Sequence, residues 1–277
     1  MRKWIILALT LAFAAVAVFG QTGLEIIVED NNDGLTIIRS TGTVQTLVIP
    51  DQIDNKPITV IGSGAFSGRG LVELTIPDSV TEIGDGAFSF NKLKSLVIGN
   101  NVAAIGQGAF TANELTSVTL GEKVNYIGKG AFSDNSLVKI AIPDNVTVID
   151  DYAFFNNKLK EITFPDSVVT IGEGAFSGNR IGSVVIGNGV TAIGAGAFYN
   201  NRITGVTLPG SLETLGKKAF DIRPAGGRIR GSVNYTDTGG ALLYTSANNF
   251  DTYYVFNGRK PGNYSLVSGA WSFSDKK

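Results

Sequence analysis

The stretch IGSGAFSG, residues 61–68, places three glycines around a single phenylalanine. The Ala-Phe pair inside this stretch recurs every 22 residues along the chain. The recurring phenylalanines are Phe66, Phe88, Phe110, Phe132, Phe154, Phe176, Phe198 and Phe220. A fixed period of this length predicts a solenoid, because a single unit cannot bury its apolar face alone and must stack on its neighbours.

Two apolar columns within each repeat predict a strand. Leu74 and Ile76 are two positions apart, as a strand with one buried face requires. Pro77 comes next, and every later repeat has proline or glycine at the equivalent position, which ends the strand in a turn. We therefore predict a repeat solenoid with a parallel sheet on one face and short strands or helical turns on the other.

The glycines of the opening stretch recur as well. The column that begins with Gly62 is glycine in every repeat except one, which has Asp150. Because aspartate tolerates left-handed backbone geometry better than most residues, this column predicts a corner with positive φ in each coil. The spacing G-x-G-x-x-x-G is one residue too long for a dinucleotide-binding fingerprint, and no long helix follows it. The pattern therefore favours chain geometry over phosphate binding.

A polar column lies three residues after each phenylalanine. Arg69 occupies it in the first repeat, and asparagine occupies it in the next six. The asparagines are Asn91, Asn113, Asn135, Asn157, Asn179 and Asn201. A ladder of amides that binds a metal or a sugar is one interpretation. We favour a structural ladder, in which each amide binds backbone groups of adjacent coils, because buried turn backbone needs hydrogen-bonding partners.

The segment LKSLVIGNNVAAIGQGAFTAN, residues 93–113, resembles the leucine-rich repeat of the BspA-like family of bacterial surface and secreted proteins. The resemblance covers Val44 to Phe220 as eight repeats, the first with a five-residue insertion before Ile61. The family repeat usually has 23 residues and a cysteine at the asparagine column, so this chain departs from it in both respects. The resemblance implies a leucine-rich-repeat arc with a β-hairpin cap at residues 21–43. It also implies adhesion, or binding of host or partner-cell proteins, in place of catalysis. The composition changes after Phe220, and because the open end of a solenoid needs closing, we predict a β-rich C-terminal cap at residues 221–277.

The N-terminus predicts export. A basic start, Met1-Arg2-Lys3, precedes an apolar run that ends in small residues at Gly20, as in a signal peptide of residues 1–20. An uncleaved membrane anchor is the alternative, since the run is just long enough to span a bilayer. We expect an extracellular, cell-surface or periplasmic protein with no integral membrane segment after cleavage.

Composition excludes several functional classes. The chain has no histidine and no cysteine, so it lacks Ser-His-Asp and Cys-His nucleophile systems and imidazole or thiolate metal sites. Loss of Arg2 and Lys3 with the signal peptide changes the formal charge from −1 to −3, which argues against a nucleic-acid partner. A Ser-Lys or two-carboxylate mechanism remains formally possible. We expect no enzymatic activity and no cofactor.

One short motif raises a metal alternative. EDNNDG, residues 29–34, resembles the start of a calcium loop, but its twelfth position is Ser40 where such loops have glutamate. Strand-like runs border the motif, so a hairpin turn is the preferred interpretation.

Two groups of residues are candidates for ligand contacts. The outward column of the predicted main strands contains Glu73, Ser95, Ser117, Lys139 and Glu161. The C-terminal region, which carries five of the eight tyrosines, contributes Tyr253, Tyr254, Arg259, Tyr264 and Trp271. Aromatic and arginine residues are typical of interaction hot spots.

We therefore predict a non-catalytic, secreted or cell-surface protein that binds a partner protein of the host extracellular matrix or of another cell's surface. The alternatives are a structural envelope spacer, or a carbohydrate-binding protein that uses the C-terminal aromatic residues. The sequence leaves the oligomeric state open.

Overall fold

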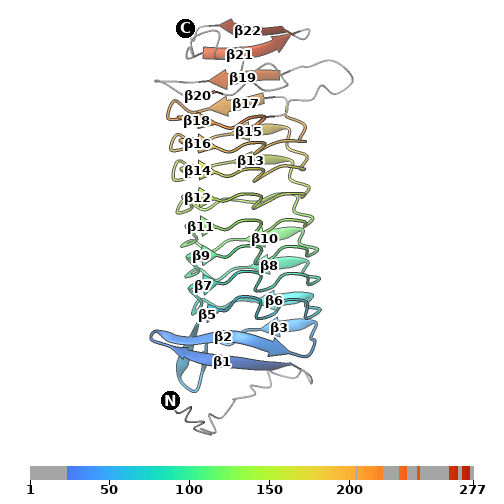
Figure 1. Ribbon diagram of the computed structural model, residues 1–277, viewed down its shortest axis with the longest axis vertical. Coiled ribbons are helices and arrows are strands. Elements are labelled where there is room, and N and C mark those ends of the chain that lie inside the picture. Colours follow the sequence, from blue (N-terminus) through green and yellow to red (C-terminus); the bar gives the residue numbers. More distant parts are fainter. Residues whose placement is uncertain are drawn as a thin grey trace, which may run out of the picture.

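The computed structural model describes residues 24–203 and 205–220, without the side chains of residues 205 and 207, and beyond them the backbone of four further strands within residues 231–274. The coils stack as a column, with the strands β1 and β2 at one end and β21 and β22 at the other (Figure 1). Strands and turns make up the described part of the chain, which contains no helix.

The first sheet is made of short strands and runs the length of the column. Its order is β1-β2-β5-β7-β9-β11-β12-β14-β16-β18-β20, with β4 paired to β5, and we call it the short-strand sheet. Its strands are β1 (Glu25–Asn31), β2 (Gly34–Thr41), β4 (Gln52–Ile53), β5 (Lys56–Ile61), β7 (Glu82–Ile83), β9 (Ala104–Ile105), β11 (Tyr126–Ile127), β12 (Val148–Ile149), β14 (Thr170–Ile171), β16 (Ala192–Ile193), β18 (Thr214–Leu215) and β20 (Leu242–Leu243). Only the β1–β2 and β4–β5 pairs in it are antiparallel.

The second sheet contains the predicted main strands and is divided in two. We call both pieces together the main sheet. One piece has the order β10-β8-β6-β3 and the other has the order β13-β15-β17-β19-β21-β22. The strands are β3 (Thr46–Val48), β6 (Glu73–Thr75), β8 (Ser95–Val97), β10 (Ser117–Thr119), β13 (Glu161–Thr163), β15 (Ser183–Val185), β17 (Gly205–Leu208), β19 (Gly231–Tyr235), β21 (Gly262–Val267) and β22 (Ala270–Ser274).

The core is a continuous stack of the eight repeated phenylalanines. Neighbouring ring centroids lie 5.0–5.4 Å apart, and the ring planes differ by 17° or less. All eight side chains are at least 96% buried. The predicted solenoid is confirmed, and the 22-residue period exists because each coil must place one ring on the next.

The corners of the coils correct our interpretation of the glycines. The column of Gly62 does not have positive φ, so that prediction was wrong. A Cβ atom at these glycines would lie 2.2–2.8 Å from backbone atoms of the preceding coil, so they are required by close approach of the chain. Positive φ occurs two residues later, at Gly64 and its equivalents, including Tyr152 (58°) and Lys218 (56°). Both requirements select glycine, and only the structure distinguishes close approach from positive φ.

The N-terminal hairpin joins the short-strand sheet. EDNNDG forms the β1–β2 turn, in which Asn31 pairs with Gly34 and the backbone N–H of Asp33 donates to Asn31 Oδ1 at 3.1 Å. The hairpin interpretation is therefore confirmed for this motif. The insertion in the first repeat forms the β4–β5 hairpin, and Lys56 Nζ contacts Asp30 Oδ1 at 2.5 Å.

Parallel pairing continues beyond the last sequence repeat. The 22-residue pattern ends at Phe220, yet β19 pairs in parallel with β17, and β20 pairs in parallel with β18. Strands β21 and β22 then add to β19 in antiparallel order. The backbone of the C-terminal region thus extends each sheet by one further parallel strand, and two antiparallel strands follow in the main sheet.

Candidate functional site

The asparagine ladder holds the turns of adjacent coils together. Asn135 Nδ2 donates to the carbonyl oxygens of Phe110 (2.9 Å) and Phe132 (3.2 Å), and its Oδ1 accepts from the backbone N–H of Leu115 (3.0 Å). The six asparagines share this pattern and are all buried. The structural role predicted for this column is confirmed. The amides are committed to the fold, so they act as a rigid frame for the surface residues beside them.

In the first repeat, Arg69 and a buried serine take the place of the asparagine. Arg69 Nε donates to Ser40 Oγ at 3.2 Å, and Ser40 Oγ donates to the carbonyl oxygen of Ala65 at 2.6 Å. Ser40 comes from β2, so the N-terminal hairpin supplies the group that the first coil lacks.

The candidate residues of the outward column lie along one face of the main sheet. All five side chains are exposed, and they come from successive coils. Glu73, Ser95, Ser117 and Glu161 are the first residues of β6, β8, β10 and β13. Lys139 differs from them, because the segment Lys139–Ala141, where a strand was expected, has no strand. We call this segment the break.

At the break the main sheet loses the backbone hydrogen bonds between neighbouring strands. No backbone hydrogen bond joins residues 139–142 to a neighbouring coil in the described part of the chain. The sequence carries one signal for this. Ala141 stands where every other coil has a β-branched residue in its main strand. Those residues are Val48, Thr75, Val97, Thr119, Thr163, Val185 and Thr207. Alanine has a lower strand propensity than β-branched residues, so the segment gains least from pairing.

A hollow of about 750 Å³ opens over the break. Its walls come from β10, from the break and from β13. Ile140 in its floor is only partly buried, whereas the equivalent Leu96 and Ile162 are 2% and 3% exposed. Lys139 and Glu161 lie on its rim, and neither makes an ion pair or a side-chain hydrogen bond among the described residues. Asp144 also lines the hollow and is exposed, so the hollow combines an apolar floor with three available charges.

Three of the five candidate residues of the outward column line this hollow, namely Ser117, Lys139 and Glu161. Glu73 and Ser95 lie on the same face outside it, and Glu73 Oε2 accepts a hydrogen bond from Thr46 Oγ1 at 3.1 Å. Sequence reasoning placed these side chains on one face but missed the hollow.

Most of the C-terminal candidate residues lie outside the part of the chain that the structure describes. Tyr253, Tyr254 and Arg259 lie outside the described residues. Tyr264 lies in β21 opposite Phe273, and Trp271 lies in β22 opposite Leu266, with only their backbone described. Their role as a contact surface stays a prediction.

Two further observations concern the described residues only. No group of three carboxylates in them lies close enough together to hold a metal ion. A search of the same residues for a helix with the length and apolarity of a membrane span finds none.

Comparison with known proteins gives consistent matches. The family model for the BspA type leucine rich repeat region matches in six copies, over residues 39–160 and 147–224. A leucine-rich repeat protein from Bacteroides ovatus is 25% identical, with 80% of this chain and 69% of that chain covered and a TM-score of 0.57. A leucine rich cell surface protein from Faecalibacterium prausnitzii is 25% identical over 73% of each chain, with a TM-score of 0.44. No match was found among curated proteins.

Proposed function

Because the chain belongs to the family of BspA-type leucine-rich repeat proteins, we propose that it is an exported, non-catalytic binding protein. It holds a partner protein on the exposed face of its main sheet, with the break as the centre of contact. The family is a repeat scaffold with a general role in protein interaction and is typically non-catalytic.

Export is supported by the N-terminal sequence. A basic tripeptide followed by an apolar run to Gly20 is typical of a signal peptide. We place the mature protein at the cell surface or in the medium, where adhesion to a host or partner cell is the role that the family suggests. The proposed division of the chain is residues 1–20 as signal peptide, 21–43 as N-terminal cap, 44–220 as repeats and 221–277 as C-terminal cap.

The single observation that carries the proposal is the interruption of the main sheet. Interfaces concentrate their energy in a desolvated apolar centre that is ringed by polar groups. The hollow over the break has this arrangement, with Ile140 in its floor and Lys139 and Glu161 on its rim. The unpaired backbone of residues 139–142 adds hydrogen-bonding groups that the other coils use within the sheet.

A charge swap tests this assignment. The chain from Gln21 onward is assayed against an array of purified extracellular-matrix proteins, first as wild type and then as Lys139→Glu/Glu161→Lys. The double variant keeps the net charge but inverts both rim charges, so we expect the affinity for the bound matrix protein to fall about tenfold or more. Thermal unfolding checks that both proteins are equally folded.

A matched control separates the break from the rest of the surface. Lys123→Glu/Glu82→Lys also swaps two exposed charges and involves β7 of the short-strand sheet. We expect wild-type affinity from this variant. An equal loss in both variants, or no loss in the first, would contradict the placement of the site. Absence of any protein binding would favour a structural spacer, and binding of neutral glycans alone would favour a carbohydrate site at the C-terminal aromatic residues.

A further inference from the structure

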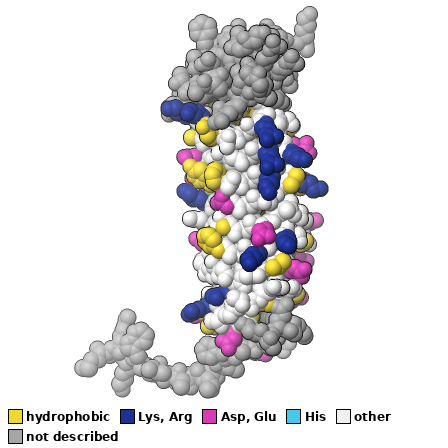
Figure 2. Space-filling view, turned by 90° about the vertical axis from the view of Figure 1, so that its right-hand side faces the viewer, with side chains coloured by type: hydrophobic (Ala, Val, Ile, Leu, Met, Phe, Trp, Pro, Cys, Tyr) yellow, Lys and Arg dark blue, Asp and Glu magenta, His cyan; other side chains and the backbone are white. Residues whose placement is uncertain are grey.

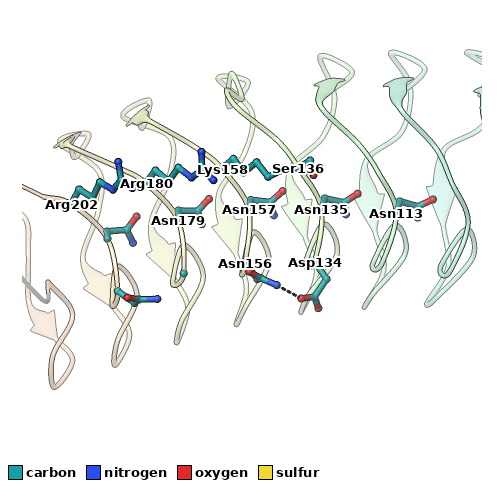
Figure 3. Close-up of a pocket in the computed structure, with 13 residues that line it drawn as sticks. Asn113, Asp134, Asn135, Ser136, Asn156, Asn157, Lys158, Asn179, Arg180 and Arg202 are labelled. Carbon is teal, nitrogen blue, oxygen red and sulfur yellow. Dashed lines mark hydrogen bonds between the residues drawn. The ribbon is translucent and has the colours of Figure 1, made fainter.

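A row of cations runs beside the asparagine ladder, on a different surface from the break. The residue directly after each ladder asparagine is a lysine or arginine in three successive coils, namely Lys158, Arg180 and Arg202. Figure 3 shows these side chains with Ser136 in one line along one side of the ladder. A vertical row of Lys and Arg side chains is also visible in the space-filling view (Figure 2). We call Lys158, Arg180 and Arg202 the basic row.

The backbone of the basic row is fixed at the pitch of the solenoid. The N–H groups of Lys158, Arg180 and Arg202 each donate to a carbonyl oxygen of the preceding coil at 2.9 Å. Adjacent members are therefore one strand spacing apart, about 4.8 Å. Each also follows a buried asparagine that is bonded on both sides. The three cations thus extend from backbone positions that are fixed in one line.

Within the described ranges, the charges of the basic row have no acidic partners. Lys158 Nζ donates to Ser136 Oγ at 3.0 Å, and neither Arg180 nor Arg202 makes an ion pair among the described residues. Asp134 is the one carboxylate lining this surface, and it accepts from Asn156 Nδ2 at 2.7 Å. Like charges on adjacent strands repel one another, so an anion bound along the row would relieve this repulsion.

The hollow along the basic row is lined by polar and charged groups, which indicate the kind of ligand that it suits. It measures about 580 Å³, and its lining consists of amides, a hydroxyl, one carboxylate, a glycine and the cations, without an aliphatic or aromatic side chain. Partner proteins need apolar or aromatic anchors, and single-stranded nucleic acids need rings on which bases stack. Sugar hydroxyls, by contrast, match the exposed amides of Asn156 and Asn200.

We propose that the basic row binds a linear sulfated polysaccharide whose chain runs parallel to the axis of the column. Sulfate groups on successive sugar units contact Lys158, Arg180 and Arg202, while sugar hydroxyls bond to the amides beside them. Guanidinium groups suit this role, because they bind planar or tetrahedral oxyanions with two parallel hydrogen bonds. The hollow shares no lining residue with the hollow over the break, so this activity is separate from protein binding at the main sheet.

Dextran sulfate is the probe that tests the proposal. Unsulfated dextran of equal length is its neutral counterpart. We expect the chain from Gln21 onward to bind only the sulfated polymer, with log K falling against log salt at a slope of about −2 to −3, as for three ionic contacts. Arg180→Gln/Arg202→Gln is expected to weaken binding roughly tenfold and to reduce the slope by about two. Both residues are exposed, so the fold is unaffected.

The matched control is Lys92→Gln/Lys94→Gln. It removes two exposed charges from an earlier coil, where Glu114 occupies the next position of the same column. Wild-type affinity and slope are expected. An equal loss in this control, an unchanged slope in the arginine variant, or equally tight binding of single-stranded DNA or polyglutamate would overturn the proposal. Lys139→Glu/Glu161→Lys should still bind dextran sulfate, so failure of the protein-binding proposal would be recognised separately.

Discussion

Two glycines of one corner meet different physical demands. A Cβ atom on Gly128 would lie 2.7 Å from the carbonyl oxygen of Ile105, so the coil below leaves no room for it. Gly130 has a φ of +60°, and a Cβ atom there would meet only the side chain of Ser133, at 3.5 Å or more. Gly128 is thus required by contact between coils, and Gly130 by the conformation of its own backbone. The second glycine is replaced by Tyr152 and Lys218, which adopt the same positive φ, and the first is replaced once, by Asp150.

Substitution of these two glycines should separate the two demands. We expect Gly128→Ala to lower the free energy of unfolding by about 2–3 kcal/mol, because it overpacks the corner. Gly130→Ala should cost about 1 kcal/mol of left-handed strain. Gly130→Asn should be close to wild type, since asparagine tolerates that conformation, whereas Gly128→Asn should be as damaging as alanine. Chemical denaturation of the four variants measures this, and an equal tolerance of asparagine at both positions would refute it.

Asp150, the one departure from the strict glycine column, takes part in a hydrogen bond. Its Oδ2 accepts from Tyr126 Oη at 2.6 Å. That hydrogen bond, followed by burial and the charge of Asp150, raises the pKa of Tyr126 to about 12. The unfolded pKa is about 10, so the contribution of this bond to stability is complete below pH 10 and is lost as the pH rises towards 12.

Removal of the phenolic hydroxyl tests this pH dependence. We expect wild-type stability to fall more steeply than that of Tyr126→Phe between pH 10 and 12, while below pH 10 the variant is less stable by about 1 kcal/mol. The pH dependence of the unfolding free energy gives the difference, and tyrosinate absorbance identifies the titrating group. Parallel curves for the two proteins would show that Tyr126 does not titrate in this range.

At the scale of the strand, one coil pairs with its neighbours in the short-strand sheet but not in the main sheet. Strand β12 of that coil pairs with β11 and β14, so the short-strand sheet is continuous at this point. The segment Lys139–Ala141 of the same coil pairs with neither β10 nor β13. The break is therefore local to one strand, and the stacked phenylalanines keep the coil in position.

Restoration of a β-branched residue should close the break. We expect Ala141→Thr to raise the free energy of unfolding by about 0.5–1 kcal/mol and to slow amide hydrogen exchange at Leu120 and Ile142. Ala192→Thr in β16 is the matched control, because it places the same substitution in a strand that is already paired. The control should leave exchange at Leu120 and Ile142 unchanged. Unaltered exchange in Ala141→Thr would mean that another feature of the coil keeps the sheet open.

At the scale of the whole molecule, the sequence predicted those features of the fold that have the same physical cause in every coil. The phenylalanine and asparagine columns could be predicted because burial of a large ring and satisfaction of turn backbone act identically in every coil. The break could not be predicted, because Ala141 is a small change at an exposed position and its effect depends on pairing with two neighbours. The basic row becomes apparent only when positions 22 residues apart are known to be adjacent in space.

The stack of phenylalanine rings has a consequence for the gene as well. Every ring meets its neighbours at nearly the same spacing, 5.0–5.4 Å, so each coil presents equivalent surfaces above and below. Unequal recombination that deletes or duplicates one 22-codon unit would therefore join surfaces that already fit. Such an event would change the reach of the column by about 4.8 Å while leaving its two ends intact. The length of this protein can thus vary between lineages by whole coils, because the added or remaining coils pack with the same core residues.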